Sequence, residues 1–198
     1  MILAIDTSGA IAVAVVDGGR TVASRSEFAP RGHAELLAGF VREALREAGC
    51  EGPERVVVGM GPAPFTGLRV GLITARTLAF AWGVPVDGVC SLDAIGAERG
   101  TCTVVTDARR REVYWATYVG GERTSGPAVS APADVLLTGA VVGRGAALYP
   151  DVFPDSIHAD PNPAFLVRVA EAARASGSDL PTEPLYLRRP DVHGITGS

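Results

Sequence analysis

One pattern occurs twice in this chain of 198 residues. Residues 2–5 form a short apolar segment that ends at Asp6, and residues 103–106 form an apolar, β-branched segment that ends at Asp107. After each aspartate comes a stretch typical of a β-hairpin, with glycines at its turn. This repetition constrains the fold, because both copies are then expected to share one topology.

The order of the remaining segments indicates an α/β protein. It predicts two tandem units of the ribonuclease-H-like type, the duplicated fold of the actin, sugar kinase and Hsp70 (ASKHA) group. The second unit is reduced, because prolines interrupt most of it. We place the units at residues 1–97 and 98–198, the latter with a polar tail. The expected strands are residues 2–5, 11–16, 21–26, 56–59, 85–89, 103–106 and 112–119, and the expected helices are residues 33–48, 68–82, 92–98 and 164–176.

Composition narrows the class of protein. An apolar fraction of 47% with 20% charged residues is typical of a globular protein. The net charge of −4 argues against a protein that binds RNA on its own, because such proteins usually carry a basic surface. Cys50, Cys90 and Cys102 form no CxxC pair, so we expect free thiols. No apolar segment is long enough to span a membrane, and we expect a cytoplasmic protein.

The segment from Gly59 to Gly71, GMGPAPFTGLRVG, connects a β-branched strand with an apolar helix. Strand-to-helix loops of this kind often hold an anion. A P-loop needs a lysine, which this chain lacks altogether, and a dinucleotide loop needs a third glycine where this chain has Pro64. Pro62 and Pro64 also remove two N–H donors. We therefore expect a stiff connection, with Thr66 as the N-cap of the helix.

Asp6 and Asp107 are nevertheless candidates for weak nucleotide binding. In the ASKHA group, acidic residues at the ends of these strands coordinate metal or position a water for phosphoryl chemistry, and Thr7 and Ser8 offer hydroxyl groups to a phosphate. A working ATPase of this type also needs a Gly-rich loop after the second aspartate, and residues 108–112 contain no glycine. We therefore favour a structural role, in which Asp6 and Ser8 cap a turn between strands.

The histidines give no sign of a metal site. His33, His158 and His193 are far apart in the sequence, and no two have the spacing of metal ligands. No GxSxG nucleophile motif occurs, and no cysteine has a neighbouring histidine. Residues 109–111 are three consecutive arginines that can contact RNA, although on an acidic protein such a run is usually solvated. We expect no metal and no cofactor.

Two of the expected helices carry wide apolar surfaces. The helix of residues 68–82 has small residues at four-residue spacing, which lets another helix approach closely, and the helix of residues 33–48 has bulky residues near its start. Most such surfaces pack on the chain's own sheet, but part of them can pack on another chain. The small residues are Gly67, Gly71 and Ala75, and the bulky ones are Leu36, Leu37 and Phe40.

Five motifs, in their order along the chain, resemble one family. They are IDTS at residues 5–8, PRGH at 30–33, GPAPFTGLR at 61–69, DARRREVYWATY at 107–118 and PLYLR at 184–188. Together they resemble the TsaB (YeaZ) family, the non-catalytic TsaD paralogues of bacterial tRNA threonylcarbamoyladenosine biosynthesis. The resemblance extends from Met1 to about Arg189. One departure is Ala63, where the family usually has glycine, and alanine tolerates a positive φ poorly.

The resemblance implies an accessory subunit rather than an enzyme. Such a subunit binds a TsaD partner, which holds the metal and the chemistry, and supports threonylcarbamoyl transfer to the adenosine beside the tRNA anticodon. The resemblance also implies the ASKHA fold, a TsaE-type ATPase as a third member, and contact with tRNA through the complex. We expect the partner on the first two helices, at an interface of Leu36, Leu37, Phe40, Leu68, Gly71, Leu72 and Ala75.

Two other functions remain open. A small ASKHA-type ATP-dependent phosphotransferase or ATPase would use Asp6 and Asp107. A homodimeric structural protein would have no TsaD partner, and an accessory subunit can also form a homodimer when it is alone. ATP binding that is lost on Asp107→Ala would favour the enzyme, whereas assembly with TsaD would favour the accessory subunit.

Overall fold

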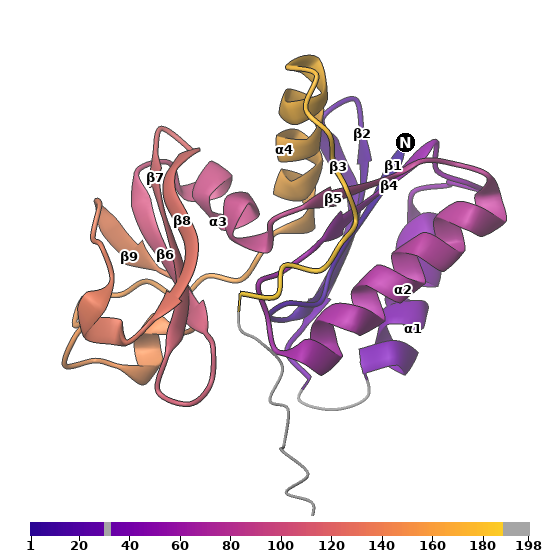
Figure 1. The fold of residues 1–198 in the computed structure, drawn as a ribbon. Helices are drawn as coiled ribbons and strands as arrows, with labels where there is room; N and C mark the ends of the chain where they lie inside the picture. The colour runs from indigo at the N-terminus through magenta and orange to yellow at the C-terminus, as the bar shows by residue number, and fades with distance from the viewer. Residues whose placement is uncertain (30–32, 188–198) are drawn as a thin grey trace, which may run out of the picture.

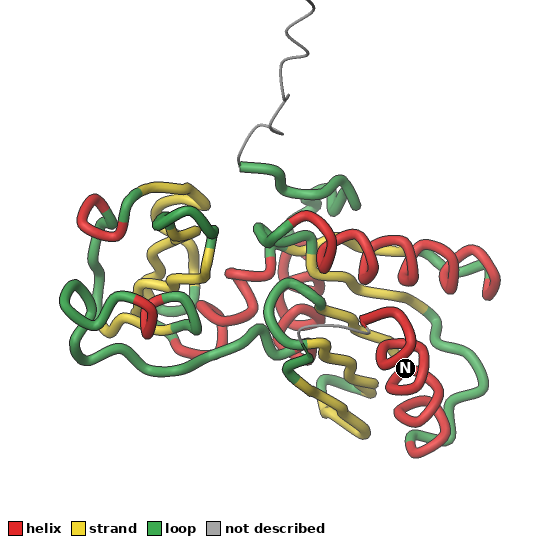
Figure 2. The backbone as a smooth tube through the Cα atoms, turned by 90° about the horizontal axis from the view of Figure 1, so that it is seen from below, coloured by secondary structure: helices red, strands yellow, loops and turns green. Residues whose placement is uncertain are grey.

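The computed structural model describes residues 1–29 and 33–187 and has two lobes (Figure 1). Each lobe is built around one β-sheet. We call the lobe that contains β1–β5 the first lobe, and the lobe that contains β6–β9 the second lobe. Seen from below, the two sheets stand apart with helical chain between them, and further helices cover the first sheet (Figure 2).

The first sheet has the strand order β3-β2-β1-β4-β5. β1, β2 and β3 pair antiparallel, whereas β4 pairs parallel with β1 and with β5. The central strands are rich in β-branched and small apolar residues, as is typical of strands that are covered on both faces. The strands are β1 (Ile2–Asp6), β2 (Ile11–Asp17), β3 (Arg20–Glu27), β4 (Arg55–Gly59) and β5 (Val86–Val89).

Helices cover both faces of this sheet (Figure 1). Successive side chains of a strand point to opposite faces, so Leu3 and Ile5 of β1 pack against α1 and α2, whereas Ala4 packs against α4. The face toward α1 and α2 holds the larger of the two apolar clusters. The helices are α1 (His33–Glu47), α2 (Phe65–Trp82) and α4 (Pro163–Ala175).

The second sheet repeats the order of the first four strands of the first sheet. Its order is β8-β7-β6-β9, with β7 antiparallel to both β6 and β8 and with β9 parallel to β6. α3 packs on this sheet and on α4, and Gly96 of α3 lies so close to the ring of Tyr118 that a Cβ atom would overlap it. The elements are α3 (Ser91–Arg99), β6 (Cys102–Asp107), β7 (Val113–Val119), β8 (Glu122–Ser130), β9 (Ala140–Val142) and the short 3₁₀ helices η1 (Pro132–Asp134) and η2 (Ala146–Leu148).

The duplicated ribonuclease-H-like fold expected from the sequence is confirmed, because both sheets share one topology. Two strands of the second sheet, β8 and β9, were not among the strands expected from the sequence. The division at residues 97 and 98 falls inside α3, and α4 packs on the first sheet although it follows the second one in the chain. The two-domain division therefore stays a prediction.

A C-terminal strap, which we define as residues 180–187, returns to the first lobe and runs beside α2 (Figure 1). The N–H of Gly88 donates to the carbonyl of Leu180 at 3.0 Å, and the N–H of Leu185 donates to the carbonyl of Met60 at 2.9 Å. Arg76 of α2 donates to the hydroxyl of Thr182 at 2.9 Å. The strap thus joins β5, the loop before α2 and α2 itself.

Over the described residues, no helix is both long enough and apolar enough to cross a membrane. The three cysteines are free, as expected. Cys90 and Cys102 are buried, whereas Cys50 is partly exposed just after α1. Burial raises the pKa of the Cys90 thiol to about 12, and burial also raises the pKa of the Cys102 thiol.

We expect one of the three cysteines to react quickly with a thiol reagent such as DTNB in the folded protein. Cys90 and Cys102 are shielded from solvent and stay protonated near neutral pH, and only the thiolate is nucleophilic. Absorbance should therefore report one fast thiol per chain under native conditions and three in denaturant. Two or more fast native thiols would contradict the packing of α3 against the second sheet.

Candidate functional site

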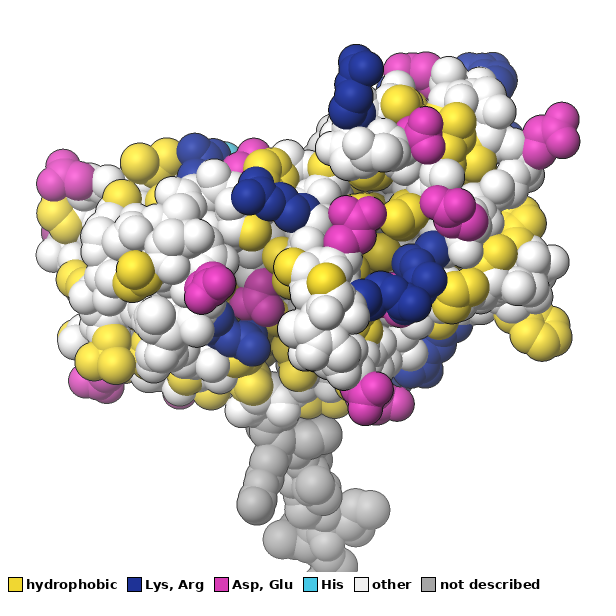
Figure 3. Space-filling model, turned by 90° about the horizontal axis from the view of Figure 1, so that it is seen from above, with side chains coloured by type: hydrophobic (Ala, Val, Ile, Leu, Met, Phe, Trp, Pro, Cys, Tyr) yellow, Lys and Arg dark blue, Asp and Glu magenta, His cyan; other side chains and the backbone are white. Residues whose placement is uncertain are grey.

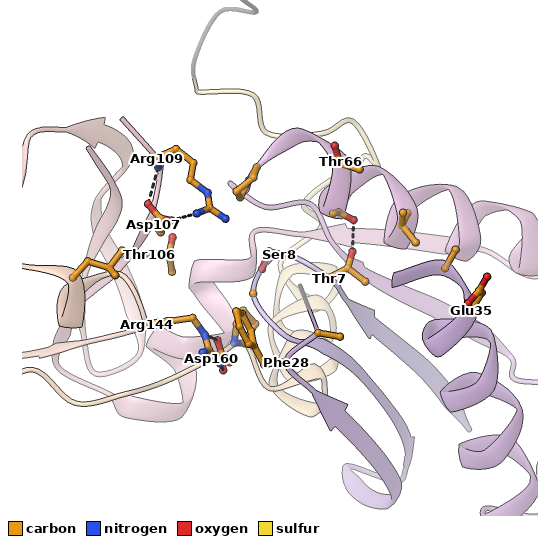
Figure 4. A pocket seen from close by; sticks show the side chains of 18 residues that line it. Thr7, Ser8, Phe28, Glu35, Thr66, Thr106, Asp107, Arg109, Arg144 and Asp160 are labelled. Atoms are coloured by element: carbon orange, nitrogen blue, oxygen red, sulfur yellow. Dashed lines mark hydrogen bonds and ion pairs between the residues drawn. The ribbon is translucent and has the colours of Figure 1, made fainter. Parts of the chain in front are cut away.

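A cleft of about 980 Å³ lies between the two lobes (Figure 4). The end of β1 supplies Thr7 and Ser8 on one side, and the end of β6 supplies Thr106 and Asp107 on the other. The strand ends meet here because the two lobes face each other, so the cleft occupies the position of a ligand site in a doubled α/β fold.

Asp6, which directly precedes the cleft residues Thr7 and Ser8, is fully buried. Its Oδ1 accepts hydrogen bonds from the N–H and the hydroxyl of Ser8, at 2.8 and 2.6 Å, and its Oδ2 accepts one from the hydroxyl of Ser91 at 2.6 Å. Gly59 of β4 packs directly against the carboxylate, where a Cβ atom would overlap Oδ2. Desolvation raises the pKa of Asp6, although the hydrogen bonds from Ser8 and Ser91 oppose this shift.

The side chain of Thr7 is hydrogen-bonded to the first turns of α2. Its hydroxyl donates to the carbonyl of Gly67 at 2.8 Å and accepts from the N–H of Gly71 at 3.1 Å. A Cβ atom on Gly71 would overlap this hydroxyl. Gly71 is therefore required for a contact within the chain, and the hydroxyl of Thr7 is already engaged by α2 as both donor and acceptor.

The other two nucleotide candidates are also engaged. The N–H of Ser8 donates to Asp6, as in an Asx-type turn, and the hydroxyl of Ser8 donates to the same oxygen. Asp107 accepts the N–H of Arg109 at 2.7 Å and forms an ion pair with its side chain at 3.3 Å. The structure thus brings Thr7, Ser8 and Asp107 to one cleft, with Asp6 buried directly before Thr7, and protein groups bind their polar atoms. Nucleotide binding by these residues stays a prediction.

Residues 109–111, which we call the Arg turn, close the β6–β7 hairpin. The three arginines have φ values of 62°, 54° and 63°, in the left-handed region that non-glycine residues rarely adopt. This conformation costs an L-residue roughly 1–2 kcal/mol. All three side chains are exposed, and that of Arg109 lies at the mouth of the cleft (Figure 4).

Another arginine, Arg144, forms a contact between the two lobes. Arg144, which follows β9, pairs with Asp160 through two hydrogen bonds, the first from Nε at 2.9 Å. Its guanidinium also lies 3.9 Å from the ring centre of Phe28, at the end of the first lobe's β3 (Figure 4). Asp160 in turn packs against Gly9, where a Cβ atom would lie 2.8 Å from Oδ1. Sequence analysis missed this cluster, because no motif connects its members.

The loop from Gly59 to Gly71 departs from expectation at its end. α2 begins at Phe65 with Pro64 at the N-cap and without a side-chain cap, so the assignment of Thr66 as N-cap was wrong. Proline at this point removes a donor that would be unpaired anyway. The positive φ of the loop falls on Gly61, at 83°, and Ala63 is buried without one. Alanine is therefore compatible with this loop.

The expected partner residues lie mainly in the protein's own core. Leu37, Leu68, Leu72 and Ala75 are at most 3% exposed and belong to the cluster that packs on the first sheet. Gly71 is buried against Thr7, and Leu36 and Phe40 are partly buried against the same cluster. These side chains therefore stabilise the lobe itself, while the interface on α1 and α2 stays a prediction. The PRGH motif falls largely on residues 30–32, outside the described residues.

The outward side of α2 carries different apolar residues. Ile73 is 63% exposed and Phe80 is 90% exposed, and their seven-residue spacing places them on one side of the helix. An apolar groove of about 480 Å³ separates α1 and α2, and its lining includes Cys50, Leu78 and Trp82 but neither Ile73 nor Phe80. Figure 3 shows apolar side chains projecting at the rim of the first lobe. We call Ile73, Phe80 and this groove the α1/α2 face.

The part of the chain that the structure describes contains no group of three or more metal-ligating side chains. His158 lies 3.3 Å from Asp160, which already pairs with Arg144.

Comparisons with known proteins fit this geometry. The family model described as TsaD, tRNA N6-adenosine threonylcarbamoyltransferase, matches residues 17–152. A solved structure, YeaZ from Pseudomonas aeruginosa, is 31% identical, covers 94% of this chain and 99% of its own, and superimposes with a TM-score of 0.78. The chain belongs to the TsaB/YeaZ family. The resemblance carried by its five motifs is thereby confirmed.

Two relatives show how much of the chain, and how much of their own length, the sequence similarity covers. An uncharacterized protein of Mycobacterium leprae is 47% identical over 99% of this chain and 57% of its own length. The tRNA threonylcarbamoyladenosine biosynthesis protein TsaB of Escherichia coli is 38% identical over 59% of this chain and 54% of its own length. The chain thus matches little more than half of the length of these relatives.

Asp6 allows a test of how this TsaB/YeaZ cleft is held together. Asp6→Ala should lower the free energy of unfolding by about 2–4 kcal/mol, because it leaves the donors of Ser8 and Ser91 without an acceptor. The measurement is urea unfolding followed by circular dichroism. An Asp6→Ala protein as stable as the wild type would contradict the buried network.

The pH dependence of the same site has a defined sign. The raised pKa of Asp6 means that the folded state holds the proton more tightly than the unfolded state, so the contribution of Asp6 to stability is full below about pH 3.8 and falls as the pH rises through the folded pKa. The amide introduced by Asp6→Asn does not titrate. The stability difference between wild type and this variant should therefore shrink as the pH rises from about 4 to 7. Asp151→Asn, at an exposed position, is the control.

Proposed function

We propose that this protein is a non-catalytic accessory subunit that binds a TsaD partner and supports threonylcarbamoyl transfer to the adenosine beside the tRNA anticodon. The observation that carries the proposal is the α1/α2 face, which comprises the exposed side chains of Ile73 and Phe80 and the apolar groove between α1 and α2. Exposed large apolar side chains and apolar grooves are both typical of an interaction site.

The choice of partner follows from the shared family. The TsaD family model covers residues 17–152 of this chain, which include both helices of the face. Two paralogues with the same pair of helices can meet face to face about a pseudo-twofold axis, as two copies of one chain do in an isologous dimer. The same geometry would let the isolated chain form a homodimer in place of the complex.

The non-catalytic role is supported by the hydrogen bonds that the polar groups at the cleft already make within the chain. The carboxylate oxygens of Asp6 and the hydroxyl of Thr7 are bound to protein groups. A metal or a phosphate at this position would have to displace those contacts. In the complex, TsaD would therefore supply the metal and the chemistry, a TsaE-type ATPase would be the third member, and tRNA would be reached through the assembly in the cytoplasm.

Phe80→Arg and Ile73→Arg should each weaken binding to TsaD by at least about tenfold, since each puts a charge at the centre of an apolar contact. Both positions are exposed, so the thermal unfolding midpoint should not change. Val119→Arg is the matched control, because Val119 is 52% exposed in the second lobe. Calorimetric titration gives the affinity, and wild-type affinity in both α2 variants would refute this interface. Leu72→Arg cannot serve as a test, because Leu72 is buried and its replacement should unfold the protein.

Cys50 reports on the same face without any substitution. Its side chain lines the groove between α1 and α2, so bound TsaD should slow its reaction with DTNB. A control measurement uses the Phe80→Arg variant, in which the protection should disappear. Unchanged labelling in a complex that has formed would place TsaD elsewhere on the chain.

The isolated chain should neither hydrolyse ATP nor modify tRNA. The rival function, an ASKHA-type phosphotransferase, is kept open by the size of the cleft, which is large enough for a nucleotide. Calorimetry with ATP and Mg²⁺ separates the two. Tight binding that Asp107→Ala abolishes, or metal-dependent turnover by the chain alone, would favour the phosphotransferase over the accessory subunit.

A further inference from the structure

The Arg turn is a feature that pairing through the α1/α2 face leaves unexplained. Among the described residues, fifteen have a positive φ; twelve are glycines, and the other three are Arg109, Arg110 and Arg111. Glycine adopts this conformation without strain, and the chain uses it wherever else a turn needs it. Three strained arginines in succession therefore point to a role for their side chains rather than for the shape of the loop.

The surroundings of the turn favour an anionic ligand. Arg109 lies across the cleft mouth from Thr66 at the start of α2 (Figure 4). α2 has no side-chain cap and no acidic residue in its first turn, so the positive end of its dipole faces the same opening. Both features add positive potential at one end of the cleft.

The carboxylates next to the turn neutralise it only in part. Asp107 pairs with Arg109, and Glu112 follows the turn directly, so the turn has three arginines against two carboxylates. Among the other residues that line the cleft, Asp160 is paired with Arg144, whereas Glu35 of α1 adds a negative charge. Figure 3 shows a face of the molecule on which acidic and basic side chains are interspersed. The turn itself is thus more basic than the whole chain, whose net charge is −4.

We propose that the Arg turn contacts the phosphate backbone of the RNA on which the complex acts. Guanidinium groups bind phosphate oxygens in a bidentate manner, and exposed arginines on one turn can follow a phosphodiester chain. Such contacts position an RNA and raise its affinity without reading its sequence. The inference rests on the proposed function, since the acidic chain alone is not expected to retain RNA.

The decisive variant is the triple substitution Arg109→Gln, Arg110→Gln and Arg111→Gln, which keeps long polar side chains and removes their charge. It is assembled with TsaD, and the affinity for tRNA is measured by fluorescence anisotropy over a range of salt concentrations. We expect at least about tenfold weaker binding, and a slope of log affinity against log salt that is less steep by about 2–3. The matched control is Arg20→Gln, Arg99→Gln and Arg168→Gln, three exposed arginines elsewhere.

Assembly with TsaD is measured in parallel by size-exclusion chromatography. A variant that assembles normally and keeps the wild-type salt slope overturns the inference and leaves the proposed function standing. An equal loss in both triple variants also overturns it, because net charge alone would then explain the effect. Failure of the wild-type chain to assemble contradicts the proposed function, and the inference with it.

Two further measurements distinguish RNA binding from binding of a small anion, and a role of the side chains from an effect on the fold. Inorganic phosphate or ATP at millimolar concentration should not displace tRNA beyond the effect of ionic strength, whereas specific displacement would indicate a small-anion site instead. Arg110→Gly with Arg111→Gly relieves the backbone strain, so the thermal unfolding midpoint should not fall while tRNA affinity does. Unchanged affinity in this stable variant would show that the side chains are not used.

Discussion

The buried carboxylate of Asp6 is the contact on which the centre of this molecule depends. It accepts three hydrogen bonds, and one of them comes from Ser91 at the start of α3. The hydroxyl of Ser91 also accepts the N–H of Gly61, and Gly59 leaves just enough room for the carboxylate. One side chain thereby connects β1, β4, the loop before α2 and the helix that leads to the second lobe. The hydrogen bonds offset only part of the cost of burying its charge, since the pKa of Asp6 stays raised.

The same position can serve two purposes in this fold, and the partners of the carboxylate distinguish them. A carboxylate that holds a metal or a water needs an oxygen that faces the cleft. Here both oxygens of Asp6 bind donors of the chain, and the hydroxyl of Thr7 is bound to α2. The cleft has therefore kept the architecture of a ligand site while its polar groups stabilise the fold. This is the physical basis for proposing an accessory role.

The sequence predicted the helices and strands well wherever the hydrophobic periodicity was strong. The apolar run of β1 and the helical spacing in α1 were sufficient, and the repeated strand with its terminal aspartate predicted the duplication. β9 has three residues, too few for a period, and β8 contains Gly126 and Pro127, which are typical strand breakers.

The functional surfaces were harder to predict. α2 is apolar on nearly all sides, so its sequence did not reveal that Leu72 points inward and Ile73 outward. The φ values of the Arg turn had no signal either, because arginine does not favour that conformation. Tertiary packing decides both features, and a single sequence carries little information on it. Asp6 and Ser8, in contrast, were expected to cap a turn, and the structure has that contact.

The path of the chain also affects how firmly the α1/α2 face and the Arg turn are held relative to each other. After the second sheet, the chain returns to the first lobe, where α4 covers one face of the sheet and the strap follows α2. Arg144 adds a contact between the lobes through Asp160 and Phe28. Because the contact of Arg144 with Phe28 and the packing of Asp160 against Gly9 cross the cleft, its opening would break both of them. An enzyme that closes on its substrate needs the lobes to move, whereas a subunit that presents one face to a partner and an Arg turn to RNA needs them held at a constant distance.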